Sequence, residues 1–236
     1  SNYWFSTGTP TFLINAIKEK DIPVIEFENI EADDTIFESF DIDNMELTSL
    51  LFQTGYLTIK EKFFCGGDAI YRLSYPNKEV RDSFLKHLLK GFTERQLVEN
   101  LKILRKLKSS INRGDLDTFF EAIKSMFASI PYNVFVDNRE GYYSSIIYLL
   151  LQLSGIEIQL EKETNIGRID AVAITENQIY IMEFKIGTSE VALKQIKEKK
   201  YYEPYLTSDK SIVLIGVGID PKIRNITDFR VEPWNP

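Results

Sequence analysis

The chain has 236 residues, of which 44% are hydrophobic and 13% aromatic, and this apolar content excludes an intrinsically disordered protein. No apolar run reaches the ~18 residues that cross a bilayer, and the opening SNYWFSTGTP lacks the regions of a signal peptide, so we expect a cytoplasmic protein with no membrane partner. One cysteine, Cys65, and one histidine, His87, exclude an internal disulfide and a Cys/His zinc cluster, so any metal is expected on carboxylates. Because the chain begins with Ser1, we expect a piece of a longer protein.

The formal net charge of -7 is divided unevenly along the chain. Residues 1–54 hold 2 basic and 11 acidic side chains, residues 55–131 hold 14 and 9, and residues 132–236 hold 12 and 15. The acidic residues 25–46 are interpreted as a solvated linker or loop, with an intramolecular mask or a partner contact as the alternative. Because the middle of the chain is basic, the low overall charge does not exclude a nucleic-acid partner.

The first 92 residues predict a mainly helical region with one hairpin. Helices are expected at 9–20, where Thr9 precedes Pro10, and at 45–57. Segments 57–64 and 69–76, expected as the two strands, flank Gly66-Gly67, which supplies the positive φ angles of a tight hairpin turn. Asn77 is expected to cap a helix over 79–92. Helix, hairpin and helix together predict a small winged-helix-like unit within a domain spanning 1–92.

Residues 93–131 predict a connector of two helices, broken at 112–114, with Asp115 as the N-cap of the second. The first of these helices is basic, and its positive side chains include Lys102, Arg105 and Lys106. Such a face is either solvated or in contact with phosphates. We predict nucleic-acid binding here.

Residues 132–236 predict a compact α/β domain. A long apolar helix ends at Gly155, and strands are expected at 156–163, 168–175 and 178–185. An amphipathic helix over 189–205, a strand over 211–219 and a last strand near 226–232 follow. The order is α-β-β-β-α-β, with the last strand added at the end.

Two acids and a lysine stand out on the second and third of these strands. Glu183 and Lys185 are two residues apart and therefore share one strand face, and a hairpin through 175–178 would bring Asp170 beside them. Two carboxylates on adjacent strands suit Mg²⁺, which completes its coordination with water and phosphate oxygens. A neighbouring lysine can orient water or offset charge when a phosphodiester is attacked. The spacing is weak evidence by itself, because surface acids at strand ends would produce it too.

The sequences GRIDAVAI, YIMEFK and ALKQIKEKKYYEPY resemble the PD-(D/E)XK nuclease superfamily, in particular the group at the C-terminus of bacterial AAA-ATPase-like proteins. The resemblance covers about residues 137–236 and implies a restriction-endonuclease-like core. It also implies metal binding by Asp170 and Glu183 and catalysis by Lys185. Lys194 and Lys197, on the amphipathic helix, are predicted as nucleic-acid contacts.

The same resemblance implies roles for further side chains. Glu140 matches the helix-borne acid of the family and is expected either as an outer metal ligand or as an acid that contacts the ligands. Gln195 is expected on the helix that packs against the site, and both residues are counted with the catalytic set. Arg168, Tyr201 and Glu161 are expected in supporting positions, although the sequence leaves open which way Glu161 points.

The first half resembles the distal part of the AAA-ATPase-like domain that precedes this kind of nuclease. The sequence contains no G-x-x-x-x-G-K-[ST], and the TGTP at residues 7–10 lacks the lysine and the spacing of a phosphate-binding loop. We therefore expect no ATP site in this chain, and we expect its ATPase-like partner module elsewhere in a longer protein.

The first hypothesis is a Mg²⁺- or Mn²⁺-dependent nuclease that cleaves DNA rather than RNA. The alternative is a nuclease fold that binds nucleic acid or docks a partner without catalysis. A third possibility is a regulated module that is silent without its ATPase.

Overall fold

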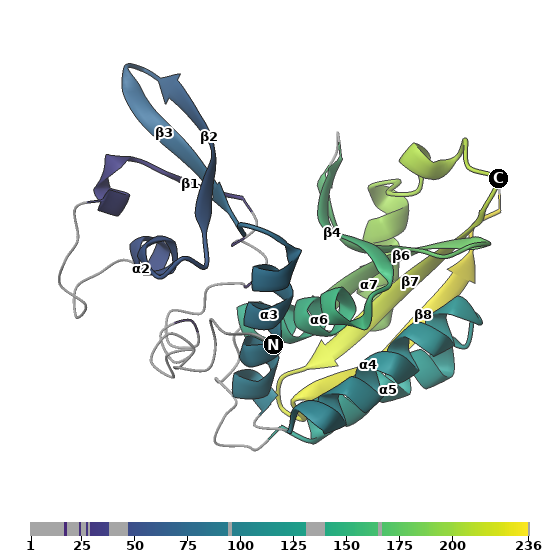
Figure 1. The fold of residues 1–236 in the computed structure, drawn as a ribbon. Helices are drawn as coiled ribbons and strands as arrows, with labels where there is room; N and C mark the ends of the chain where they lie inside the picture. The colour runs from purple at the N-terminus through teal and green to yellow at the C-terminus, as the bar shows by residue number, and fades with distance from the viewer. Residues whose placement is uncertain are drawn as a thin grey trace. The chain divides into compact units, whose positions relative to one another are not determined.

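The computed structural model describes Ile17, Val24, Phe27 and residues 29–37, 47–93, 96–130, 140–164 and 167–235, with some side chains outside this description. The chain divides into two compact units, Ser1–Phe92 and Thr93–Pro236 (Figure 1). The helix predicted at 9–20 lies outside the described residues, except for Ile17. Within the described residues, no helix combines the length and the apolar character needed to cross a membrane.

The first unit contains a three-stranded antiparallel sheet in the order β1-β3-β2. Its elements are β1 (Ile30–Ala32), the short 3-10 helix η3 (Asp34–Phe37), α2 (Leu47–Gln53), β2 (Thr58–Cys65), β3 (Asp68–Ser74) and α3 (Lys78–Thr93). The predicted hairpin is confirmed: β2 and β3 pair across a turn in which Gly66 and Gly67 have φ of 63° and 104°. Whether these elements make a winged helix stays a prediction.

Part of the acidic segment is folded, and its interpretation as a solvated linker is wrong for residues 30–37. β1 pairs with β3, and Glu31 forms an ion pair with Arg72 of β3 at 3.2 Å. The Tyr71 hydroxyl donates to Asp34 at 2.7 Å. A three-residue strand is too short for a periodic signal, and its partners come from about 40 residues away, so local pattern did not reveal it.

Helix α3 begins where the sequence predicts. The Val80 N–H donates to Oδ1 of Asn77 at 2.9 Å, so Asn77 caps the helix. The apolar stripe of α3 is buried, with Phe84, Leu85 and Leu88 fully covered.

The second unit is built on a five-stranded sheet in the order β4-β5-β6-β7-β8. Its elements are α4 (Leu97–Asn112), α5 (Leu116–Ala128), α6 (Glu140–Ser154), β4 (Glu157–Thr164), β5 (Gly167–Ile174), β6 (Gln178–Ile186), α7 (Ser189–Glu198), η4 (Glu203–Tyr205), β7 (Ser211–Asp220) and β8 (Asn225–Pro233). From α6 onward, the predicted order of helices and strands is confirmed. Among the described strands of this sheet, β6 and β7 are the one parallel pair, because α7 crosses over between them.

Helix α7 is shorter than the 189–205 predicted. It ends at Glu198, and Lys200 adopts the left-handed conformation with φ of 47°. The Tyr201 N–H then donates to the Ile196 carbonyl at 3.1 Å, which closes the helix end. The amphipathic pattern continued past this point because Tyr201 and Tyr205 are buried although they lie outside α7.

Helices α4 and α5, expected as a connector, belong to the second unit. Asp115 caps α5 by accepting from the Thr118 N–H at 3.1 Å, as predicted. Phe120 of α5 stacks on Phe229 of β8, with ring centroids 4.3 Å apart. These helices therefore help to form the core of the domain.

The two faces of the five-stranded sheet carry different partners. Val172, Ile181 and Leu214 point to one face and pack with residues of α7, including Leu193 and Ile196. Alternate positions point to the other face, where the Tyr180 hydroxyl donates to the Ile111 carbonyl of α4 at 3.3 Å. Figure 1 shows α4 and α5 along β7 and β8 on that other face.

Candidate active site

Asp170 and Glu183 lie side by side on β5 and β6. The register pairs Ala171 with Met182, which makes Asp170 the neighbour of Glu183 on the adjacent strand. Oδ2 of Asp170 accepts the Phe184 N–H at 2.8 Å, so the backbone of β6 holds this carboxylate in place. The hairpin expected from the sequence thus brings the two acids together.

The Glu183 side chain is 1% exposed and is held through only one of its two oxygens. Oε1 lies 3.2 Å from Nζ of Lys185, two residues away on the same strand face, and it also accepts from Nε2 of Gln195 on α7. Oε2 is buried, and the described part of the structure offers it no hydrogen-bond partner. An unsatisfied carboxylate oxygen is costly to bury and points to a missing ligand.

The surroundings of Glu183 favour its protonated form when no cation is bound. The pKa of Glu183 is raised to about 7, chiefly by burial and then by the negative charge of Asp170. Lys185 opposes this rise through its charge and its hydrogen bond, but less strongly than burial raises the pKa. A strongly perturbed carboxyl beside a second acid is typical of functional sites.

Two glycines in β7 let α7 approach the sheet at this point. Gly216 lies opposite Glu183 and Gly218 opposite Lys185 in the parallel pairing. A Cβ at Gly216 would lie 2.2 Å from the Ser189 carbonyl oxygen, and one at Gly218 would lie 2.7 Å from the Gly187 carbonyl oxygen. Larger residues would push the first turn of α7 off the sheet and move Gln195 away from Glu183.

The start of α7 is also tied to β8. Oγ of the buried Ser189 donates to Oδ2 of Asp228, and the Ser189 N–H donates to Oδ1 at 3.4 Å. Burial raises the pKa of Asp228, but these hydrogen bonds and one from Thr227 outweigh it, so the pKa lies below its ordinary value. Sequence reasoning missed this pair. The sequence did contain one signal. Glycines interrupt a strand that otherwise consists mainly of Ile, Val and Leu, and such glycines indicate that another backbone approaches closely.

The donor set fits a small divalent cation. Mg²⁺ is commonly bound through one or two carboxylates and several waters, and Asp170 and Glu183 supply two carboxylates and one unpartnered oxygen. Ligating carboxylates are normally oriented by further hydrogen bonds, which is what Gln195 and Lys185 provide to Oε1. Among the described side chains, no third Asp, Glu, His or Cys joins them.

Three predicted site residues have side chains outside the described part of the structure. Glu140 is the first residue of α6, Glu161 lies in β4 and Arg168 in β5, and only their backbone placement is described. Tyr201 is buried in the apolar cluster that includes Leu193 of α7. It therefore supports the helix by packing.

The predicted basic contacts divide between the two faces of the sheet. Lys194 and Lys197 lie on α7, on the same face as Glu183, and pair with Glu198 and Glu232. Lys102, Arg105 and Lys106 are exposed on α4, on the opposite face. The structure does not bring these two groups together.

Over 240 aligned residues, the chain is 33% identical to an uncharacterized protein from the vnfD 5′ region of Azotobacter chroococcum mcd 1. The alignment covers 98% of this chain but 46% of that relative, so the chain spans about half the length of the relative. No solved structure matches the chain.

The family model of the PD-(D/E)XK nuclease superfamily matches residues 138–229. This range begins just before α6 and ends within β8, so it contains β4 to β7, the first part of β8, α7 and the Asp170–Glu183–Lys185 cluster. A PD-(D/E)XK nuclease superfamily domain therefore occupies residues 138–229 of this chain.

Proposed function

We propose that this domain is a Mg²⁺- or Mn²⁺-dependent nuclease that hydrolyses phosphodiester bonds in DNA. The Glu183 carboxylate, which adjoins Asp170, is the observation that supports the proposal. Two donors fix one of its oxygens. The other oxygen is buried and has no hydrogen-bond partner in the described structure. The superfamily match at 138–229 supports a nuclease-type reaction.

In this proposal Asp170 and Glu183 hold the divalent ion. Once bound, the ion supplies Lewis-acid polarisation of the scissile phosphate and a lowered pKa for a coordinated water. Glu183 must be ionised to serve as a ligand, and because its pKa is raised to about 7 without a cation, metal affinity falls as the pH drops below that value.

Lys185 is the group proposed to act on the reacting atoms. Its side chain is 31% exposed, so the ammonium reaches solvent while it lies 3.2 Å from Glu183. From this position it holds positive charge where the phosphodiester gains negative charge, and it orients the attacking water. Gln195 is a positioning residue, because it acts through Glu183.

We also propose that cleavage is coupled to an AAA-ATPase-like module in a longer protein. The sequence resemblance of residues 1–92 supports this, as does the length of the Azotobacter relative, of which this chain covers 46%. The winged-helix-like elements of residues 45–92 would then end that module. A cytoplasmic location follows from a DNA substrate in a bacterial cell.

The test is cleavage of plasmid and single-stranded DNA and RNA with Mg²⁺ or Mn²⁺, alongside calorimetric titration of each metal. Glu183→Gln keeps the shape of the side chain and removes the charge, so it should lose both metal binding and product. Glu190→Gln is the matched control, because Glu190 is an exposed acid of α7 that pairs only with Arg230 among the described residues, at 3.6 Å.

Cleavage that survives in Glu183→Gln would refute the assignment. DNA binding by the wild-type chain with neither metal binding nor product would favour the alternative, a nuclease fold used for binding or docking. Metal binding without cleavage would indicate that the missing ATPase-like module controls the reaction.

A further inference from the structure

Helix α4 presents a row of cations to solvent on the side that faces away from the sheet. Leu104 and Leu107 lie on its buried side. Lys102, Arg105 and Lys106 are exposed and lie three and four residues apart, so they form one stripe on the outer side. The helix holds four basic side chains and one acidic side chain. Positive charge is therefore concentrated here, in a chain whose formal net charge is -7.

The three cations of this stripe are not neutralised by neighbouring acids. Within the described ranges, Lys102, Arg105 and Lys106 form no ion pair. Asp115 is the acid that Lys106 influences: hydrogen bonds from Thr118 are the main cause of the lowered pKa of Asp115, and the charge of Lys106 is the smallest contribution. The positive charge on the outer side of α4 is therefore available to an external anion.

The fourth cation of α4 has a different position. Nζ of Lys108 lies beside Gly155, just past the end of α6. A positive charge there complements the carbonyl groups at the end of a helix. Lys108 is therefore left out of the proposed contact.

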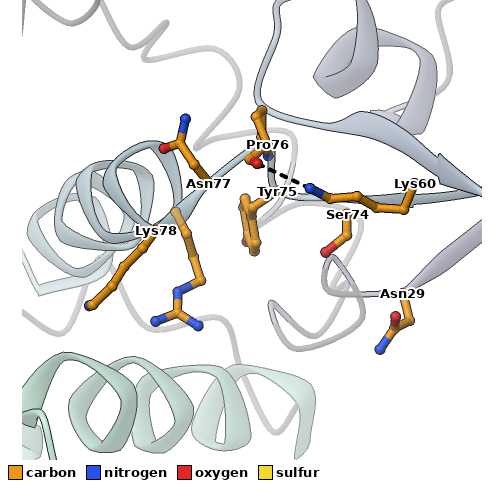
Figure 2. A pocket seen from close by; sticks show the side chains of 8 residues that line it. Asn29, Lys60, Ser74, Tyr75, Pro76, Asn77 and Lys78 are labelled. Atoms are coloured by element: carbon orange, nitrogen blue, oxygen red, sulfur yellow. Dashed lines mark hydrogen bonds between the residues drawn. The ribbon is translucent and has the colours of Figure 1, made fainter.

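Cations that gather in the first unit are engaged in local contacts. Lys60, Lys78 and Arg81 line a pocket of about 350 Å³ where β3 leads into α3 (Figure 2). Lys60 donates to the Pro76 carbonyl at 3.0 Å, as the dashed line in Figure 2 shows, and Lys78 and Arg81 both pair with Asp82. The two predicted DNA contacts of α7 are paired with acids as well. The stripe on α4 differs from both groups.

We propose that the outer side of α4 binds the phosphate backbone of a DNA segment separate from the one that is cleaved. The inference rests on the proposed function, because the DNA substrate supplies the anion. Arg105 offers a planar guanidinium that can bind one phosphate through two hydrogen bonds, and Lys102 and Lys106 add point charges. Contacts of this kind hold a duplex without reading its sequence.

The position of α4 separates this contact from the catalytic site. Tyr180 of β6 reaches α4 on one face of the sheet, whereas Glu183 of the same strand meets Gln195 of α7 on the other face. The sheet and α4 together are roughly 20 Å thick. Duplex DNA has a persistence length of about 500 Å, so it is too stiff to fold around so thin a body. We therefore expect α4 to hold a second segment.

The first experiment measures DNA binding in EDTA, so that the result does not depend on metal or on cleavage. Fluorescence anisotropy with a labelled duplex is recorded over a range of salt concentrations. Glutamine removes each charge and keeps a high helix propensity. The α4 variant is Lys102→Gln/Arg105→Gln/Lys106→Gln, and the matched control, which removes three exposed cations outside α4, is Lys90→Gln/Lys199→Gln/Lys222→Gln. Thermal melting verifies that each variant folds.

We expect the α4 variant to bind at least about tenfold more weakly, with the slope of log K against log salt reduced by about 2–3, because up to three phosphate contacts are lost. The control should stay within about threefold of the wild type. Equal losses in both variants would overturn the inference, since net charge alone would then explain the binding. Unchanged DNA affinity in the α4 variant would also overturn it, and a labelled oligoglutamate peptide that binds the wild type but not this variant would then assign the stripe to an acidic protein segment.

A bridging assay tests whether the DNA held by α4 is a second segment. An immobilised duplex is saturated with protein in EDTA and then offered a labelled duplex. The wild type and the control should capture the label, and the α4 variant should not. Failure of the wild type to capture it, or capture that survives in the α4 variant, would overturn the assignment of a separate segment.

The two proposals fail separately. Cleavage that depends on Glu183, together with normal DNA binding by the α4 variant, would remove the second contact and leave the nuclease. Binding and bridging that depend on α4, without cleavage by the wild type, would do the reverse.

Discussion

Each of the two sheets carries a strand glutamate beside a cation at the same distance, and the two pairs differ in burial. Glu31 lies 3.2 Å from Arg72 in the first unit with 56% of its side chain exposed, whereas Glu183 lies 3.2 Å from Lys185 with 1% exposed. Water screens the first pair, which is worth little to stability. The second pair is shielded, and its Glu183 has a raised pKa and an unpartnered Oε2 among the described residues. Burial, rather than the ion pair, distinguishes a candidate site from an ordinary surface contact.

The largest expected effect comes from removing the cation of the buried pair. Lys185→Ala should lower the rate of DNA cleavage about 10²–10³-fold, because preorganised charge at a reacting group is worth that much. Arg72→Ala removes the cation of the exposed pair and should leave the rate within about twofold. Single-turnover cleavage assays measure both, and similar losses in the two variants would erase the proposed distinction between the pairs.

The second prediction concerns the pH dependence of the free energy of unfolding, which should differ between variants of Glu183 and of Glu31. With the pKa of Glu183 at about 7 in the folded chain and 4.5 as its ordinary value, the metal-free wild type loses stability as the pH rises between these values. Glu183→Gln removes that penalty, so above pH 7 it should be more stable than the wild type by on the order of 3 kcal/mol, and below pH 4.5 the two should converge.

Urea unfolding at pH 4.5 and pH 8 in EDTA measures this effect. Glu31→Gln should change the free energy of unfolding by less than about 0.5 kcal/mol at both pH values. A Glu183→Gln variant less stable than the wild type at pH 8 would contradict the assignment of a buried, raised pKa.

Glycines give a third comparison between the units. Gly216 provides space, because a Cβ there would meet the Ser189 carbonyl and Leu193, whereas Gly66 provides a positive φ with no heavy atom within 4 Å of an added Cβ. Gly216→Ala should cost about 1–3 kcal/mol of stability and also reduce cleavage, since α7 must shift. Gly66→Asn, which tolerates φ of 63°, should be close to neutral. Thermal melts and cleavage assays measure the two effects. A Gly216→Ala variant that loses stability but keeps the cleavage rate would show that this glycine matters for packing alone.

The smallest expected effect concerns the anchor of α7. Asp228→Ala leaves the buried Ser189 hydroxyl without its acceptor and should cost about 1 kcal/mol, with a reduced metal affinity because Gln195 loses its fixed position. Asp228→Asn keeps an acceptor and should restore most of the metal affinity. If calorimetry shows equal metal affinity in the wild type and both variants, Asp228 has a structural role alone.

Residues near in sequence were the predictable part of the site. Lys185 shares a strand face with Glu183 because side chains alternate with a period of two along a strand. The position of Asp170 beside them was predictable because a short hairpin joins β5 to β6. Gly216 and Gly218 were visible in the sequence, but the reason for them was not. Both lie in close contact with the backbone of Ser189, which belongs to a different element. Asp228 and β1 were not predictable, because their partners are separated from them by about 40 residues.

The amino-acid sequence alone determined the order of helices and strands in the second unit, the caps at Asn77 and Asp115, and the pairing of Asp170 with Glu183 and Lys185. These depend on periodicity and on hydrogen bonds between residues close along the chain. Tertiary structure alone decided that Glu183 is buried, that Gln195 and Lys185 share one of its oxygens, and that the cations of α4 lie on the sheet face opposite Glu183. The reason is that burial and electrostatic environment are set by every element that packs around a side chain, and those elements come from distant parts of the sequence.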